Sequence, residues 1–220
     1  EITTRLVGSE MCIRDRNISS QMEPTLNTLG TSAKELSAQA PRYAEQMQAQ
    51  VAALKQFSDN IQELSSLENS LTEPYEMGEV NAGTFCESVM EKAKEFMKPD
   101  VTPSVNAPKL QVKTNKEQLE RILLYLLKNA AFYTEQGRIS LDFKKRGAHT
   151  HQFIITDTGT GIPAEQQENL FKPFTQVKDL TTGDGLGLPI CSLIATKMNG
   201  SLTLDTSYTK GCRFILELHA

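Results

Sequence analysis

Residues 153–190, FIITDTGTGIPAEQQENLFKPFTQVKDLTTGDGLGLPI, decide how the rest of this chain is interpreted. A short apolar run beginning at Phe153 ends in Asp157, and Gly159 and Gly161 follow. A polar segment with two phenylalanines then leads to a second glycine cluster, which opens another apolar run. Glycines let backbone N–H groups approach phosphates closely, and a helix N-terminus adds a favourable dipole. The pattern therefore predicts a nucleotide pocket with a covering segment.

Composition excludes some classes of partner and favours a reducing compartment. The chain has 220 residues and a formal net charge of -4, which gives no basic surface for nucleic acid. Its four cysteines, Cys12, Cys86, Cys191 and Cys212, show no CxxC or metal-ligand spacing, and we expect them to be reduced. No apolar run approaches the roughly 18 residues that cross a bilayer. We expect a cytoplasmic location, or the cytoplasmic part of an inner-membrane receptor whose membrane segment lies outside this chain.

The N-terminal segment, residues 1–16, reads EITTRLVGSEMCIRDR and has no helical or strand periodicity. The string VGSEMCIRDR looks like translated adapter sequence. We therefore expect residues 1–16 to be non-native or disordered, with the native N-terminus missing, and exclude them from the fold prediction.

Two amphipathic helices are predicted over residues 17–72. Apolar residues from Met22 to Ala40 are spaced four, three, four, three and four apart, which is a continuous a/d seam. Pro41 suits the first turn of a second helix, whose seam runs from Met47 to Leu64. One narrow stripe on each helix is not fully buried in an isolated hairpin, so we predict a homodimer in which two hairpins form a four-helix bundle. The alternative is a hairpin packed on its own domain.

A separate α+β domain is predicted over residues 73–220. Strands are expected at residues 75–80, 110–113, 139–143 and 153–157 and at two segments after residue 200, with helices over residues 82–97, 116–133 and 186–198. Asn81 is the predicted N-cap of the first of these helices, and Thr114 forms a capping box with Glu117 at the second. Because successive strands look like hairpins while the helices cluster, we expect an α/β sandwich with three helices on one face of a mixed sheet.

One face of the first predicted helix in this domain is apolar. The residues expected to be buried there are Phe85, Val89, Ala93 and Phe96. Pro99, Pro103 and Pro108 enclose a loop in which an edge strand is expected.

Four motifs, LLKNA, DTGTGIP, LFKPF and GDGLGL, occur in this order along the domain. They resemble the N, G1, F and G2 boxes of sensor histidine kinases, whose ATP-binding domain is related to the ATPase domain of type II topoisomerases. The two seam helices resemble the dimerisation and phosphotransfer hairpin of the same kinases. The resemblance covers Ile18 to the C-terminus. It implies ATP and Mg²⁺ as cofactors, a homodimer through the hairpin, and the receiver domain of a response regulator as partner.

The resemblance also implies roles for single residues. Asp157 should accept a hydrogen bond from the adenine amine, because a buried carboxylate is costly without a donor; the alternative is a turn cap. Asn129 should coordinate Mg²⁺ through its amide oxygen, or else end its helix as a cap. Tyr133, on the same helical face, should stack on adenine or pack in the core. The other nucleotide-binding positions are Gly159, Gly161, Ile162, Gly183, Gly185, Leu186, Gly187 and Leu188.

The segment between the glycine clusters is the expected lid. Phe171 and Phe174 should hold it against the domain. Lys172 and Lys178 are candidates for contact with phosphate, although solvated lid charges are the simpler interpretation.

Some positions depart from the family pattern. Ser20 falls where these kinases carry the phosphoaccepting histidine, and the chain's three histidines (His149, His151 and His219) all lie outside the hairpin. A serine hydroxyl does not replace an imidazole nitrogen in forming a phosphoramidate. In the N box, Tyr125 stands in place of a metal-binding asparagine and Phe132 in place of a phosphate-binding lysine. These changes should weaken Mg·ATP binding or turnover.

The predicted function is the ATP-binding core of a two-component sensor histidine kinase. Family members pass the γ-phosphoryl group of ATP to histidine and then to an aspartate of a response regulator. No catalytic residue is assigned here, since Ser20 occupies the acceptor position, and autophosphorylation should be reduced or absent. The alternative is a nucleotide-binding pseudokinase or scaffold that regulates a partner kinase or response regulator. A third hypothesis is an ATPase of the same superfamily that acts as a conformational clamp.

Overall fold

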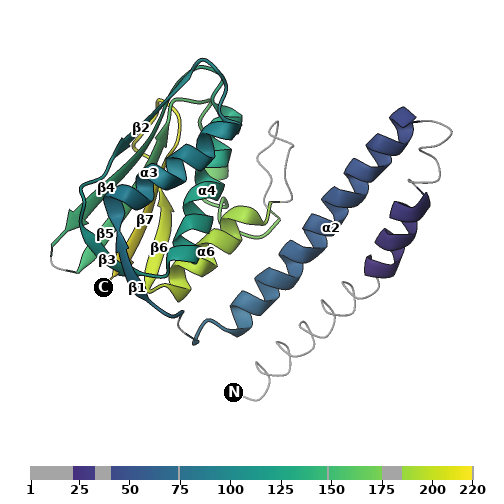
Figure 1. The fold of residues 1–220 in the computed structure, drawn as a ribbon, viewed down its shortest axis with the longest axis horizontal. Helices are drawn as coiled ribbons and strands as arrows, with labels where there is room; N and C mark the ends of the chain where they lie inside the picture. Colours follow the sequence, from purple (N-terminus) through teal and green to yellow (C-terminus); the bar gives the residue numbers. More distant parts are fainter. Residues whose placement is uncertain (1–21, 33–40, 74, 148, 175–184, 220) are drawn as a thin grey trace. The chain divides into compact units, whose positions relative to one another are not determined.

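The computed structural model describes residues 22–32, 41–73, 75–147, 149–174 and 185–219, with the backbone alone at residues 41–44. The chain divides into two compact units, unit 1 (Glu1–Asn69) and unit 2 (Ser70–Ala220). Figure 1 gives the element labels. No helix in the described part of the chain is long and apolar enough to cross a membrane.

Unit 1 contains two helices, residues 22–32 and α2 (Pro41–Asn69). The helix α2 begins at the predicted proline, whose missing N–H is not needed in a first turn. Added at Gly30, a Cβ would lie 3.9 Å from Cγ1 of Val51, so the two helices are in ordinary contact there. They run side by side in Figure 1. The predicted parts of the first helix at residues 17–21 and 33–40, Ser20 among them, lie outside the described residues.

The predicted apolar seam of unit 1 is buried only in part. Leu26 and Leu64 are buried, whereas Leu29 and Leu54 remain 37% and 42% exposed. Both exposed leucines belong to the predicted seam, the surface that the predicted dimer would bury. The dimer predicted from the seam stays a prediction, because a single chain does not test it.

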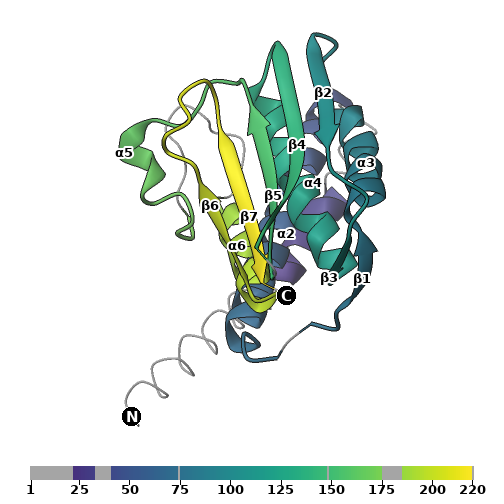
Figure 2. The same cartoon turned by 90° about the vertical axis from the view of Figure 1, so that its left-hand side faces the viewer.

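Unit 2 is built on a mixed five-stranded sheet, with helices on one of its faces (Figure 2). The strands in spatial order are β2 (Val101–Asn106), β4 (Gly137–Arg146), β5 (Thr150–Asp157), β7 (Arg213–His219) and β6 (Gly200–Leu204). Only β2 and β4 pair in parallel; the other neighbours are antiparallel. The covering helices are α3 (Ala82–Ala93), α4 (Lys116–Tyr133) and α6 (Gly187–Lys197). The predicted α+β fold, with three helices on one face of a mixed sheet, is confirmed.

The core lies between the helices and the sheet. The alternation of apolar residues along the strands, which places every second side chain in this core, was predicted from the sequence. In the register, Phe143 pairs with Phe153, and Phe153 pairs with Leu216. All three side chains are buried, and the rings of Phe143 and Phe153 meet edge to face at 5.0 Å. The same alternation places Ile155 and then Asp157 on the helix-facing side of β5. The carboxylate of Asp157 therefore lies at the end of a buried row of apolar side chains.

Two of the predicted strands, those expected at residues 75–80 and 110–113, form a separate second sheet, and this pairing was not predicted. The strand β1 (Gly78–Asn81) pairs antiparallel with β3 (Gln111–Thr114), apart from the main sheet. The expected edge strand among the prolines is β2, which carries Pro103 at an edge of the main sheet, where a missing N–H is tolerated. A four-residue helix, α5 (Ala164–Gln167), follows the first glycine segment.

Two local predictions were wrong. The N-cap of α4 is Asn115, whose side chain accepts from the Gln118 N–H, and not Thr114, whose buried hydroxyl has no hydrogen-bond partner among the described residues. Phe96 is 47% exposed, because α3 ends at Ala93 and a 3₁₀ turn turns the next residues outward. The Phe96 ring instead packs under the Lys128 ammonium at 4.3 Å.

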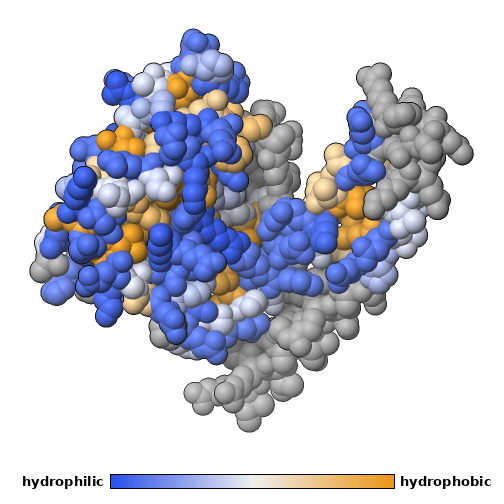
Figure 3. Space-filling view, in the orientation of Figure 1, coloured by the Kyte–Doolittle hydropathy of each residue, from blue (hydrophilic) through white to orange (hydrophobic). Residues whose placement is uncertain are grey.

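The outer face of unit 2 in Figure 3 is largely hydrophilic, with separate apolar areas.

The caps at the other helix ends follow the predictions. The side chain of Asn81 accepts from the Thr84 N–H at 3.1 Å and caps α3. Asn199, at φ 57°, ends α6 just before Gly200, in the left-handed conformation that asparagine tolerates.

Candidate functional site

Asp157 ends β5 as a buried carboxylate, 4% exposed, with one of its oxygens fully engaged. Its Oδ1 accepts hydrogen bonds from the backbone N–H of Gly159 at 2.9 Å and of Cys212 at 3.1 Å. Burial raises the pKa of this carboxyl above its usual value, and the two backbone hydrogen bonds oppose that shift. Among the described residues, none donates a hydrogen bond to Oδ2. The turn-cap alternative accounts for Oδ1 and leaves Oδ2 for another donor.

A loop from the neighbouring strand β7 braces this carboxylate. Gly211 has φ +143°, and a Cβ there would lie 2.2 Å from the Asp157 carbonyl oxygen. The hydroxyl of Tyr208 donates to the same carbonyl at 3.2 Å. Burial, and secondarily the nearby Asp157, raise the pKa of the Cys212 thiol to about 12, so this cysteine is not a nucleophile at neutral pH.

The first glycine segment lies directly on the C-terminal end of α4. Added at Gly159, a Cβ would lie 2.4 Å from the carbonyl oxygen of Tyr133, so only glycine fits. The N–H of Thr160 donates to that carbonyl at 3.3 Å. Tyr133 is half-buried, and its ring meets Phe132 edge to face at 4.9 Å. Gly161 has φ +73°, a backbone conformation that glycine adopts without strain.

The second glycine segment starts α6. Leu186, fully buried, is the N-cap of α6, and Gly187 is its first residue. Gly187 packs against the ring of Tyr125: an added Cβ would lie 2.1 Å from the ring carbon Cζ. Gly185 has φ 69°, and its carbonyl accepts from the Phe174 N–H at 3.2 Å. This bond joins the two described residues that flank residues 175–184; Gly183 and Lys178 belong to that segment and lie outside the described residues.

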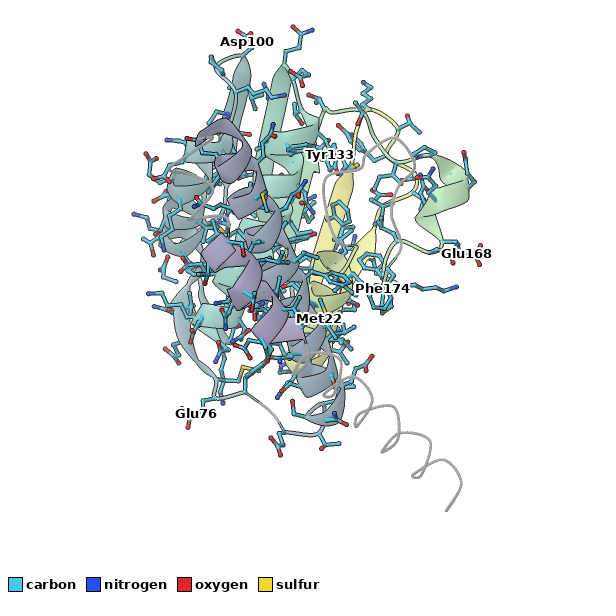
Figure 4. All side chains as sticks on the ribbon, turned by 90° about the vertical axis from the view of Figure 1, so that its right-hand side faces the viewer. Met22, Glu76, Asp100, Tyr133, Glu168 and Phe174 are labelled. Atoms are coloured by element: carbon cyan, nitrogen blue, oxygen red, sulfur yellow. The ribbon has the colours of Figure 1, made fainter. Side chains whose placement is uncertain are left out.

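The helix α4 therefore contacts both glycine segments. The Tyr133 carbonyl lies against Gly159, and the Tyr125 ring lies against Gly187. Eight residues separate the two contacts, which is about 12 Å along a helix. Asn129 lies midway, half-buried, on the same side of α4 by its spacing. In Figure 4, Tyr133 and Phe174 lie on the same side of unit 2 as Glu168, which follows α5.

Comparisons with known proteins agree on the family. Residues 114–220 match the family described as histidine kinase-, DNA gyrase B-, and HSP90-like ATPase. The aerobic respiration control sensor protein ArcB of Escherichia coli (strain K12) is 26% identical over 195 residues, covering 84% of this chain and 25% of ArcB. The sensor histidine kinase RppB of Synechocystis is 35% identical over 126 residues, covering 54% of this chain and 27% of RppB. Residues 114–220 belong to this ATPase family, and the relatives support a sensor histidine kinase core in this chain.

Solved structures show the same fold for the kinase core. Full-length ShkA in complex with AMPPNP has a TM-score of 0.77 at 21% identity, over 94% of this chain and 46% of ShkA. The Acinetobacter baumannii histidine kinase AdeS has a TM-score of 0.69 at 19% identity, over 90% of this chain and 96% of the AdeS chain. The chain spans about a quarter of the length of ArcB and RppB, so these relatives extend well beyond the kinase core.

The side chains of the kinase core fit a nucleotide base better than they fit a metal ion. The buried Asp157 offers Oδ2 to a donor such as an exocyclic amine. Among the described residues, no three His, Cys, Asp or Glu side chains lie together to hold a metal. Asn129 supplies one neutral oxygen, and Tyr125, one turn earlier, supplies a phenol. Mg²⁺ prefers carboxylate, carbonyl and phosphate oxygens.

The predicted site and lid residues that the structure describes fall into three groups. Those brought to the two glycine segments and to α4 between them are Asn129, Tyr133, Asp157, Gly159, Gly161, Gly185, Leu186 and Gly187. Ile162 and Leu188 are half-buried; the Ile162 carbonyl accepts from the Gln167 side chain, and Leu188 lies in the first turn of α6. Phe174, 59% exposed with φ 64°, does not bury its ring as an anchor, and the exposed Lys172 bonds to Asn169.

Sequence reasoning missed the loop behind Asp157. Tyr208 and Gly211 hold the end of β5, yet they lie more than fifty residues further along the chain. The available signal was the sequence Lys210-Gly211-Cys212 just before the last strand, because a glycine there indicates a close approach of backbone.

Proposed function

We propose that unit 2 is the ATP-binding domain of a two-component sensor histidine kinase. The observation that carries the proposal is Asp157: a buried carboxylate with two backbone donors on Oδ1 and no donor on Oδ2 among the described residues. A carboxylate oxygen at this place that no described residue occupies is able to accept a hydrogen bond from a ligand N–H. Adenine supplies that donor through its exocyclic amine. The AMPPNP bound to ShkA, a protein of the same fold, supports the choice of an adenine nucleotide.

The base and the phosphates would occupy opposite ends of the site. We assign the base end to Tyr133, Asp157, Gly159, Gly161 and Ile162, and the phosphate end to Gly183, Gly185, Leu186, Gly187 and Leu188. The support is that α4 contacts both glycine segments about 12 Å apart. At the phosphate end, the N-terminus of an eleven-residue helix favours negative charge.

Mg²⁺ would enter this site bound to the phosphates. Asn129, between the two ends, would be its protein ligand through the amide oxygen. This proposal is supported by the position of Asn129 midway along the contact side of α4 and by the preference of Mg²⁺ for hard oxygen ligands.

Unit 1 would serve as the dimerisation hairpin, within the predicted boundaries of residues 17–72. Two copies would bury the half-exposed seam around Leu29 and Leu54 in a four-helix bundle. A response regulator receiver domain would be the signalling partner, and a cytoplasmic location would bring both together. Sedimentation of the purified chain tests the dimer: a monomer at micromolar concentration would contradict it.

A second candidate function is a nucleotide-binding pseudokinase or regulatory scaffold. The observation that favours it is Ser20 at the expected acceptor position, with His149, His151 and His219 all in unit 2. A serine hydroxyl does not form the phosphoramidate of the family. On this alternative, nucleotide occupancy would set the state of the hairpin and so regulate a partner kinase or response regulator.

Labelled ATP separates the candidates. The purified chain is incubated with γ-labelled ATP and Mg²⁺, and both bound nucleotide and phosphoprotein are measured. Binding without an acid-labile, base-stable phosphoprotein supports the pseudokinase. That phosphoprotein, if it forms, supports the kinase. A chain that hydrolyses ATP without becoming labelled fits an ATPase clamp. Absence of any binding contradicts the ATP-binding proposal itself.

A further inference from the structure

Tyr125 occupies space at the phosphate end of the site. Its half-buried side chain projects from α4 onto the first residue of α6. A Cβ added at Gly187 would lie 2.1 Å from Cζ, 2.2 Å from the hydroxyl oxygen and 2.3 Å from Cε2 of Tyr125. The tip of the phenol ring is therefore in close contact with the backbone at the N-terminus of α6.

The contact between Tyr125 and Gly187 bears on metal binding because the proposed Mg²⁺ ligand, Asn129, follows Tyr125 on the same helix. Asn129 is one turn further along α4 and is the amide oxygen nearest in sequence to this contact. Tyr125 and Asn129 share one side of α4 by their spacing, so the phenol ring takes up room on the side of α4 that meets the N-terminus of α6. An ion that keeps several waters needs room and hard oxygen ligands, and a bulky neutral ring supplies neither.

The acidic side chains that the structure describes at this site do not replace the missing metal ligand. Asp157, the buried carboxylate, lies at the base end, with Oδ1 held by Gly159 and Cys212. No group of three His, Cys, Asp or Glu side chains suited to a metal exists among the described residues. Among the described residues, the base end thus supplies a carboxylate, whereas the metal end supplies one amide and one phenol.

From these contacts we infer that Tyr125 makes nucleotide binding by this domain nearly independent of Mg²⁺. The inference rests on the proposed function and deepens it. Affinity then comes from the base end and from the α6 N-terminus, whose N–H groups interact with phosphate without a metal. The ion, when present, adds little, because Tyr125 supplies a bulky neutral ring on the side of α4 that carries Asn129.

The test measures the dissociation constant of ATP by calorimetry, with excess Mg²⁺ and with a chelator. For the wild-type chain, the two constants should agree within about threefold. Tyr125→Asn opens the space and adds a second amide, so Mg²⁺ should tighten binding at least about tenfold, or about 1.4 kcal/mol. Tyr125→Phe keeps the ring and should behave like wild type. The control Tyr75→Asn removes a tyrosine that packs under Lys197, away from these contacts, and should leave the Mg²⁺ effect unchanged.

The outcomes separate this inference from the proposed function. Wild-type binding that weakens at least tenfold on removal of Mg²⁺ overturns the inference and leaves ATP binding intact. No ATP binding in either condition overturns the proposed function and the inference with it. If Mg²⁺ changes the ATP dissociation constant equally in the wild type and in Tyr125→Asn, Tyr125 does not limit the contribution of the metal. Thermal unfolding shows whether each variant is folded. If Tyr125→Asn does not fold, the effects of Mg²⁺ on ATP binding by the wild type and by Tyr125→Phe still test the inference.

Discussion

The backbone of Gly211 lies so close to Asp157 that a Cβ at position 211 would be 2.2 Å from the Asp157 carbonyl oxygen and 2.9 Å from its Oδ1. This contact places the N–H of the next residue, Cys212, on the carboxylate at 3.1 Å. The orientation of the proposed adenine acceptor therefore depends on a glycine in the loop that precedes β7.

Gly211→Ala should destabilise unit 2 by at least about 2 kcal/mol, because the new methyl meets backbone atoms and φ +143° disfavours any side chain. Nucleotide affinity should fall as well, since Asp157 must shift. Urea unfolding and ATP titration measure the two effects. The matched control is Gly147→Ala, which also has a positive φ of 70° but open space, and should cost about 1 kcal/mol with unchanged affinity. Equal losses in the two variants would refute the contact argument.

Gly159→Ala should weaken ATP binding at least about tenfold, because its methyl would press on the Tyr133 carbonyl at 2.4 Å and move the first glycine segment off α4. The control Gly78→Ala adds a methyl with no atom within 4 Å and should bind normally. Calorimetry on both variants checks this. Normal affinity in Gly159→Ala would show that the segment is not part of the site.

Asn115→Ala should lower the free energy of unfolding by about 1 kcal/mol, since it removes the cap on the Gln118 N–H. Thr114→Val should be neutral or stabilising, because the buried Thr114 hydroxyl has no hydrogen-bond partner among the described residues. Chemical denaturation of the two variants compares them directly. The reverse order of stabilities would restore Thr114 as the cap.

Asp157→Asn should raise the melting temperature of the nucleotide-free chain at neutral pH. Burial raises the pKa of this carboxyl in the folded state above the ordinary 3.8, so the native state binds its proton more tightly than the unfolded state. The ionised group thus costs stability above the folded pKa, and this cost disappears below pH 3.8. The difference between variant and wild type should shrink as the pH falls through that window. A difference in melting temperature that grows as the pH falls would contradict the raised pKa of Asp157 in the folded state.

The sequence predicted the elements with strong local signals and missed those set by distant contacts. The alternation at Ile139, Leu141 and Phe143 and the helix over residues 116–133 are properties of short segments, and both are confirmed. Whether Thr114 or Asn115 caps α4 depends on where β3 ends. The strand was predicted at residues 110–113 and lies one residue later, at Gln111–Thr114, where it pairs with β1 about thirty residues upstream. Phe96 has the right helical spacing for burial, but a 3₁₀ turn intervenes.

The candidate site shows the same division. The motifs identified Asp157 and the glycines directly, because each motif is contiguous in the sequence. The contact of Tyr125 with Gly187 and the brace from Tyr208 and Gly211 join residues that lie far apart along the chain. Such contacts are set by tertiary packing, so a local pattern such as the glycine at 211 indicates a close approach of backbone without naming the partner.

The most direct test of the central claim compares the binding of ATP and of inosine triphosphate, which has a carbonyl oxygen in place of the exocyclic amine. If the amine donates to Asp157, the wild-type chain should bind ATP at least about tenfold more tightly than inosine triphosphate, and Asp157→Asn should lose most of that preference. Equal affinities for the two nucleotides in the wild-type chain would contradict the placement of adenine at Asp157.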